Sequence, residues 1–241
     1  MVQPRTHVIG KSKKIKVTDP NFLIYTKKEV ILILLFALIA SFISFMPLIP
    51  TTPFPIFLRV FVFLIILTSS ISAKKLVSKK YSIKIEHSLW KFQRYGFKKK
   101  YKFKNPIPLG IIFPIALGFL SLGILKPFSF FQYDAENIPS RRLLKSRGSR
   151  YQRKEEINES DLAYTSTAGF CILLIIAVFG WLIKPIFPLF GYEITKYSIY
   201  YGIWNLLPIG QLDGIKIFFG SFILWFFIAF IYLILLPLAI I

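Results

Sequence analysis

Residues 205–214 read Asn-Leu-Leu-Pro-Ile-Gly-Gln-Leu-Asp-Gly, and they lie within a long apolar stretch, Tyr197–Ile215. The stretch carries one acid, Asp213, five residues after Pro208. An ionisable group at membrane depth costs roughly 2.5–3.5 kcal/mol on insertion scales, so it marks a candidate functional site. The alternative is an acid at the membrane interface, near a helix end and paired with Lys216.

The composition of the chain is that of a membrane protein. It has 241 residues, of which 55% are hydrophobic, whereas ordinary soluble chains are roughly 45–50% apolar. Its mean hydropathy is +0.60. Because about 20 apolar residues cross a bilayer as a helix, six apolar stretches predict an all-α polytopic membrane protein. They are Val30–Ile49, Ile56–Ala73, Pro106–Leu125, Thr165–Ile183, Tyr197–Ile215 and Ile217–Ile241.

Basic residues gather immediately outside these stretches. The chain has 31 Lys and Arg against 11 Asp and Glu, for a formal net charge of +20. Such clusters follow the positive-inside bias and contact anionic lipid head groups, so we expect a lipid bilayer as partner and no nucleic acid. Basic blocks at 5–28, 74–104 and 126–154 are predicted to be cytosolic. Only three basic residues fall on the predicted outer face: Arg59, Lys184 and Lys196.

This charge pattern predicts a multi-pass protein of the cell membrane with a cytosolic N-terminus. Residues 1–29 would form a basic cytosolic tail, residues 30–217 the membrane domain, and residues 218–241 a C-terminal transmembrane helix. The sequence contains two histidines, His7 and His87. A metal site of two or three His ligands is therefore nearly excluded.

The third apolar stretch, Pro106–Leu125, conflicts with the charge pattern because basic blocks flank it on both sides. It also contains three prolines and three glycines. Broken backbone at membrane depth is tolerated only where protein or a cavity satisfies it. We therefore predict a re-entrant hairpin within a helical bundle, with Asn105 and Lys126 on the same, cytosolic side. A proline-kinked span is the alternative.

Short strands are predicted in the basic regions. Residues 83–89 alternate apolar and polar side chains, and Tyr101 and Phe103 alternate with lysines. A period of two with one apolar face indicates a short cytosolic β-like segment on the membrane surface. The segment Asp134–Asp161 mixes both signs of charge densely, which predicts a solvated cytosolic loop.

The stretch around Asp213 resembles the signature of a known family, the site-2 proteases, which are intramembrane zinc metalloproteases. The matching residues are Asn205, Pro208, Leu212, Asp213 and Gly214. The resemblance implies that Asp213 stands where the family has its third zinc ligand. It also implies that Asn205 and Pro208 break the helix where the substrate enters.

The resemblance covers roughly residues 56–217 and implies a site-2-protease-like helical core over that range. Ser166-Thr167-Ala168-Gly169 is similar to the small-residue start of the family's middle core helix. Phe170 stands where a proline is common in the family.

The family carries a second motif, HExxH, in which two His on one helical face bind zinc and the Glu is the general base. Its best match lies at Ser70, Ile71 and Lys74, and all three motif residues are replaced. A second alignment places Glu86-His87 near the motif but gives one His without a partner, and we interpret His87 as an ordinary residue of the surface strand. A catalytic zinc site needs three protein ligands, so we predict no catalytic residue and no metal.

The replacement of the second motif histidine by Lys74 has a physical meaning. It occupies the second His position, so it could approach Asp213 and replace the zinc dication by a fixed monocation. In the alternative arrangement, Lys74 extends to the cytosolic interface beside Lys75.

Three functions are consistent with these observations. The leading hypothesis is a proteolytically inactive relative of site-2 proteases that binds or regulates a transmembrane client, which could add a strand to the edge of the β-like segment. The first alternative is an active metallopeptidase with unconventional ligands such as Asp213 and His87, the one case in which zinc is a cofactor. The second is a small-solute carrier lined by Asp213 and Lys74, although the chain lacks the repeated halves common in transporters.

Overall fold

The computed structural model describes residues 25–46, 54–81, 83–94, 102–137, 143–145, 151–153 and 157–240. Most of the predicted basic tail, the turn at 51–53 and parts of the predicted loop at 134–161 lie outside the described residues. The helices of the described part are α1 (Lys27–Phe45), α2 (Phe54–Lys80), α3 (Leu109–Leu120), α4 (Glu159–Ile183), α5 (Pro188–Leu206), α6 (Asp213–Gly220) and α7 (Phe222–Ile240).

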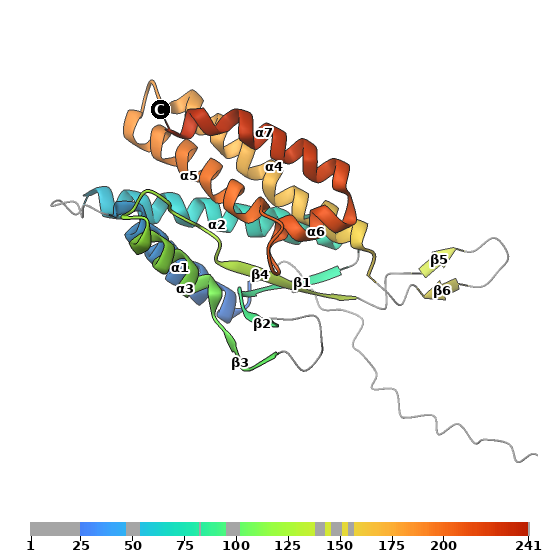
Figure 1. Ribbon diagram of the computed structural model, residues 1–241. Helices are drawn as coiled ribbons and strands as arrows, with labels where there is room; N and C mark the ends of the chain where they lie inside the picture. The colour runs from blue at the N-terminus through green and yellow to red at the C-terminus, as the bar shows by residue number, and fades with distance from the viewer. Residues whose placement is uncertain are drawn as a thin grey trace, which may run out of the picture.

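The prediction of a largely helical chain with helices that could span a membrane is confirmed. Within the described residues, α1, α2 and α4 are long and apolar enough to cross a membrane, and shorter apolar helices lie at Leu109–Leu120 and Phe222–Pro237. The helices run roughly along one direction (Figure 1). We call the end of this bundle that carries the sheet of β1 and β4 the sheet end. The opposite end, with Ser44 of α1 and Arg59 of α2, is the Arg59 end.

Two predicted spans are interrupted. The stretch Tyr197–Ile215 divides because α5 ends at Leu206 and α6 begins only at Asp213, with Pro208 in the non-helical segment between them. Proline lacks a backbone N–H and clashes with the preceding turn. The last stretch, Ile217–Ile241, divides at Ser221, which has extended backbone dihedrals between α6 and α7.

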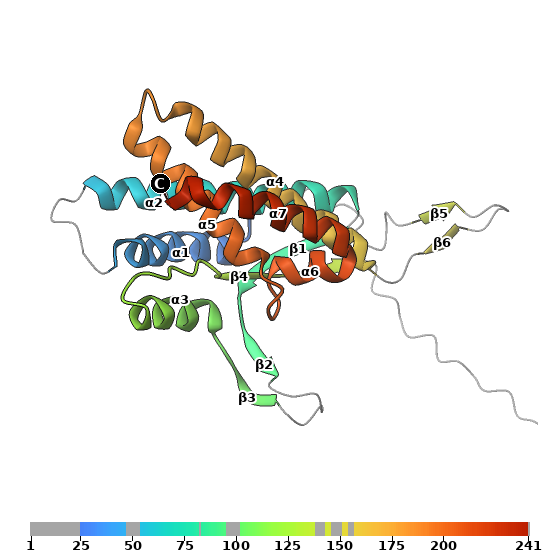
Figure 2. The same cartoon turned by 45° about the horizontal axis from the view of Figure 1, so that its top comes forward.

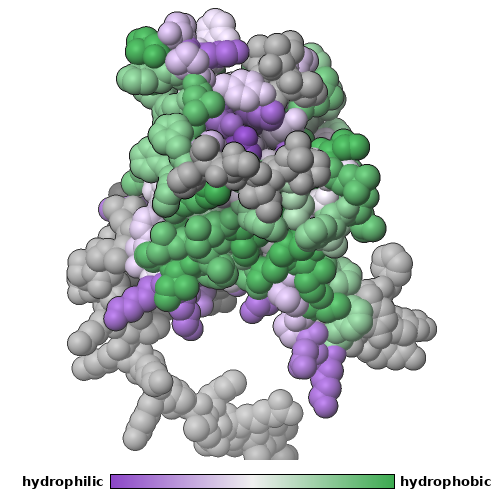
Figure 3. Space-filling model, turned by 90° about the vertical axis from the view of Figure 1, so that its left-hand side faces the viewer, coloured by the Kyte–Doolittle hydropathy of each residue, from purple (hydrophilic) through white to green (hydrophobic). Residues whose placement is uncertain are grey.

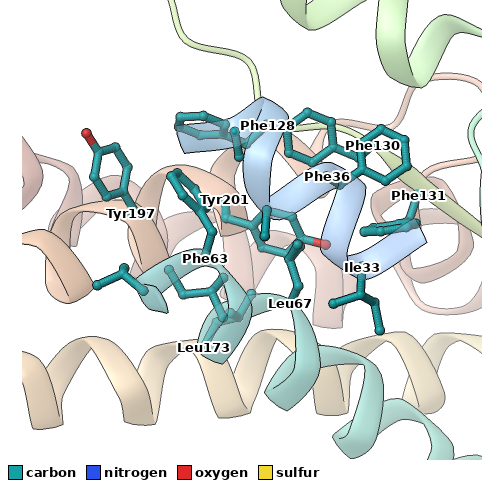
Figure 4. Close-up of a cluster of buried hydrophobic side chains, with 14 of the residues drawn as sticks. Ile33, Phe36, Phe63, Leu67, Phe128, Phe130, Phe131, Leu173, Tyr197 and Tyr201 are labelled. Atoms are coloured by element: carbon teal, nitrogen blue, oxygen red, sulfur yellow. The ribbon is translucent and has the colours of Figure 1, made fainter. Parts of the chain in front are cut away.

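Aromatic residues fill the core between the helices. The cluster joins α1, α2, α5 and an extended segment, 127–131, whose phenylalanines are buried (Figure 4). Phe36 stacks on Phe130 with ring centroids 5.1 Å apart, and Phe63 lies 4.8 Å from Tyr197. Burying such rings stabilises a fold by both area and ring geometry. The core thus ties the extended segment firmly to the bundle.

The strands of the described part form three two-stranded antiparallel sheets. Strand β1 (Ile83–Leu89) pairs with β4 (Phe131–Asn137), β2 (Phe92–Arg94) with β3 (Lys102–Ile107), and β5 (Leu143–Lys145) with β6 (Tyr151–Arg153). The predicted alternation over 83–89 is confirmed, since Ile83, Ile85 and His87 are buried and the residues between them are exposed. The predicted solvated loop is wrong at its start, because residues 134–137 belong to β4.

The chain follows the path of the predicted hairpin, but the returning segment lies beyond the predicted range of 106–125. Helix α3 runs beside α1 from the sheet end, and the chain then returns as an extended segment to β4 (Figures 1 and 2). Lys126 Nζ donates to the backbone oxygen of Ser44, 2.7 Å away, at the Arg59 end. The prediction that Asn105 and Lys126 both lie on the cytosolic side stays a prediction. The return occurs after Lys126, because residues 127–131 are apolar enough to run through the core.

Candidate functional site

Asp213 and Lys74 form a buried ion pair at the sheet end. Lys74 Nζ of α2 donates to Asp213 Oδ2, the first residue of α6, and the two side chains are 3% and 7% exposed. Asp213 lies at a helix N-terminus, where the helix dipole favours a negative charge. The predicted approach of Lys74 to Asp213 is confirmed, and the alternative in which Lys74 extends to the interface is wrong.

Helix α4 passes close to this pair because it presents small residues. A Cβ on Gly169 would lie 2.5 Å from Lys74 Cε and 3.1 Å from Ser70 Oγ, so a larger residue there would displace the lysine. Ser166, one turn earlier, is buried and lies 2.7 Å from the hydroxyl of Tyr133 on β4. The small residues at 166–169 therefore bring α2, α4 and β4 together around the ion pair.

A second buried pair lies beside the first. Lys75 Nζ donates to Glu29 Oε2 of α1 at 2.5 Å, with side chains 5% and 1% exposed. Glu29 also accepts the backbone N–H groups of His87 and Thr26, both at 2.9 Å. This carboxylate thus connects α1, α2 and β1. Sequence reasoning missed the pair, although Thr26 and Glu29 have the spacing of a capping box.

His87 lies on the predicted strand and on its apolar face, as the alternation over 83–89 predicted, but its place beside Glu29 was not predicted. Its side chain is buried on the inner face of β1, with Nδ1 3.4 Å from Glu29 Oε1. Its ring centroid lies 5.7 Å from that of Tyr133. Burial lowers the pKa of His87 from 6.5 to about 4, so the ring is neutral near pH 7.

The broken segment between α5 and α6 is held from both sides. Asn205 Nδ2 donates to the backbone oxygens of Tyr201 and Phe128, at 2.7 and 3.0 Å. A Cβ on Gly214 would lie 2.0 Å from the backbone oxygen of Leu206, so only glycine fits this return. The motif residues predicted from sequence therefore shape the interruption between α5 and α6. They include Leu212, which is the N-cap of α6.

Trp90 lies against the same segment with an unused donor. Its indole Nε1 is buried and finds no hydrogen-bond partner among the described residues. A Cβ on Gly210 would lie 2.8 Å from this nitrogen. A buried donor without a partner costs about 1–3 kcal/mol.

Both edges of the β1–β4 sheet are capped by charged side chains at the level of the site. His87 and Tyr133 are direct partners in the register, and their backbone groups point outward, as in a non-hydrogen-bonded pair. The His87 N–H donates to Glu29, whereas the Tyr133 oxygen accepts Lys216 Nζ at 2.6 Å. Lys216 therefore contacts the β4 edge rather than pairing with Asp213, which was the alternative for that acid.

The residues at the family's metal positions do not fit zinc. Ser70, Ile71 and Lys74 lie on α2 with Lys74 facing Asp213, so one carboxylate stands opposite an ammonium group. A catalytic zinc site uses three N, S or O ligands, and a charged lysine repels a dication. Among the described residues, no group of three or more His, Cys, Asp and Glu is placed to hold a metal ion.

Comparisons with known proteins add nothing to the description of this site. No protein-family model, no curated protein and no solved structure matches this chain.

Proposed function

We propose that this chain is a proteolytically inactive relative of the site-2 proteases that binds a transmembrane client at the broken segment between α5 and α6. The observation that carries the proposal is the Lys74–Asp213 pair. It joins the two positions at which the sequence resemblance would place a second and a third zinc ligand. An ammonium group there keeps the carboxylate neutralised without a metal, so peptide hydrolysis by zinc-bound water has no basis.

Two features of the site support binding of an extended client segment. The Trp90 indole N–H has no partner in the described part of the chain, and a backbone carbonyl of a client would satisfy it. The outer edge of β4 offers the Tyr133 carbonyl, which Lys216 caps. A client strand that adds to this edge must displace the lysine, so Lys216 would regulate access.

Restoring the metal motif tests the resemblance itself. The variant Ser70→His, Ile71→Glu, Lys74→His should bind about one zinc per chain, with Asp213 as the third protein ligand. The parent protein and the same variant carrying Asp213→Asn should bind none, as measured by elemental analysis after dialysis. If Ile71→Glu prevents folding, the two His substitutions alone provide the test. A folded variant without zinc would show that these positions do not correspond to the family motif.

Photo-crosslinking tests the client. The protein carries a photoreactive residue at Ile209, which is exposed in the segment between α5 and α6. It is mixed with a probe, a synthetic single-span peptide that contains a central Asn-Gly-Pro. The probe should be crosslinked more than a polyleucine-alanine span and should remain uncleaved. A photoreactive residue at the exposed Phe230 of α7 is the matched control. Equal yields at Ile209 and Phe230 would indicate lipid-like contact only and would contradict client binding.

A further inference from the structure

The Arg59 end of the bundle carries cations that the proposed function does not use. Arg59 binds Glu193 of α5 through two contacts, Nη2–Oε1 at 2.9 Å and Nε–Oε2 at 3.1 Å. Its Nη1 also donates to the backbone oxygen of Ser44, 3.1 Å away, and Lys126 Nζ donates to the same oxygen. Glu193 is thus engaged by Arg59, and Lys126 is held by a carbonyl that carries no full charge.

Two more lysines surround Tyr192 of α5. Lys196 Nζ donates to the Tyr192 hydroxyl at 2.8 Å and lies 5.0 Å from the ring centroid. Lys184 Nζ lies 5.6 Å from the same centroid. Lys196 is also close enough to Lys126 to repel its charge. Within the described residues, none of these three lysines forms an ion pair, although Glu193 is close enough to Lys126 to attract its charge.

The cluster lies far from the sheet end along the helices. Ser44 lies 15 residues beyond Glu29 on α1, or roughly 22 Å along a helix, and the hydrocarbon core is about 30 Å thick. A chain that spans the bilayer along these helices would bring the sheet end and the Arg59 end toward opposite head-group regions. Basic residues concentrate at one face of membrane proteins, and the sheet end already carries Lys79 and Lys80. The lysines at the Arg59 end therefore need a binding partner different from that of the sheet-end lysines.

The surroundings of the lysines favour a lipid over a free anion. The α4–α5 turn exposes Ile186, Phe187 and Leu189, at 72%, 63% and 49%. Figure 3, which looks onto this end, shows hydrophilic side chains in its upper part set among hydrophobic ones. A ligand that contacts both surfaces has an anionic head group and apolar chains.

We infer that Lys126, Lys184 and Lys196 bind the phosphate of an anionic lipid head group, with the Tyr192 hydroxyl as a further hydrogen-bonding group. Phosphate oxygens accept charge-assisted hydrogen bonds from ammonium groups, and each lysine has three N–H donors. The acyl chains lie against the exposed apolar side chains of the α4–α5 turn. The site is independent of the Lys74–Asp213 pair, at the other end of the bundle.

The test measures lipid binding by the full chain in a neutral detergent, with native mass spectrometry as the readout. The parent protein should bind short-chain phosphatidylglycerol about tenfold more tightly than short-chain phosphatidylcholine, because only the former has a net charge. The double variant Lys126→Gln, Lys196→Gln should lose this preference. The control double variant Lys79→Gln, Lys80→Gln, which removes two exposed lysines at the sheet end, should keep it.

Further variants and competitors make the result decisive. Lys126→Arg keeps the charge and should keep the preference. If Lys126→Gln prevents folding, Lys184→Gln with Lys196→Gln leaves the Ser44 contact intact and should still lose it. Inorganic phosphate that displaces the lipid at equal concentration would overturn the lipid assignment. No preference in the parent, or an equal loss in the control variant, would overturn the site.

Discussion

At the sheet end Lys74 and Lys75 each face a carboxylate, whereas at the Arg59 end Glu193 faces Arg59 and three lysines have no carboxylate ion-pair partner among the described residues. The first arrangement is closed: Lys74 with Asp213 and Lys75 with Glu29 satisfy each other inside the protein. The second is open, because its lysines contact a carbonyl, a hydroxyl and an aromatic ring rather than a carboxylate. We infer that sheet-end charges determine stability and that Arg59-end lysines serve binding. The predictions below test this difference, from the largest expected effect to the smallest.

Removing Lys74 should have the largest effect. Lys74→Leu leaves Asp213 buried and unpaired, which should lower the free energy of unfolding by about 3–5 kcal/mol. Thermal and denaturant unfolding in detergent measure the loss. Adding Asp213→Leu should recover part of it, because breaking one side of a buried pair is the expensive step. The exposed Lys79→Leu on the same helix is the control. A double variant no more stable than Lys74→Leu would contradict the coupling.

Lys75→Leu should destabilise the protein by about 3 kcal/mol, because Glu29 would keep only backbone N–H partners. The same unfolding measurement applies, and Glu29→Gln with Lys75→Leu should be milder than Lys75→Leu alone. A loss below that of Lys79→Leu would show that the Glu29 pair is not closed in solution.

His87 gives the sheet end a pH dependence. Its pKa falls from 6.5 to about 4 on burial, so the unfolded chain binds more protons than the folded chain between these values. Stability should therefore fall as the pH falls, by about 2 kcal/mol between pH 7.5 and pH 5. The variant His87→Gln cannot titrate, and its unfolding free energy should depend less on pH over this range. An unchanged slope in His87→Gln would assign the effect to other groups.

The sequence predicted the Lys74–Asp213 pair because the resemblance places Lys74 at a ligand position beside Asp213, and an unpaired carboxylate at membrane depth is costly. It did not predict the Glu29–Lys75–His87 group. Glu29 stands at the edge of an apolar stretch, where a solvated acid is the ordinary case, and its burial depends on β1 packing against α1 and α2. Strand β4 was missed for a similar reason, since Asp134 and Glu136 on its exposed face look like loop residues when the partner strand is unknown.

The hairpin shows a different limit of sequence patterns. Its two basic flanks predicted a return that is complete at Lys126, whereas Lys126 donates to the Ser44 carbonyl at the Arg59 end and the chain returns after it. A charge pattern counts lysines without regard to such local partners. The aromatic residues 128, 130 and 131 carry the chain back through the core, and their burial depends on Phe36 and Phe63, which lie far away in the sequence.

The smallest stability effect is expected for Lys196. Its ammonium group contacts the Tyr192 hydroxyl and no carboxylate in the described part of the chain, and surface substitutions of this kind change stability by about 0.5 kcal/mol or less. Lys196→Met should therefore unfold like the parent in detergent. In phosphatidylglycerol-containing vesicles, which stabilise a protein that binds the lipid only in its folded state, the parent should gain more thermal stability than Lys196→Met. Lys79→Met should gain as much as the parent. If Lys196→Met loses stability in detergent as Lys74→Leu does, the Arg59 end is closed like the sheet end, and the lysine serves the fold rather than a lipid.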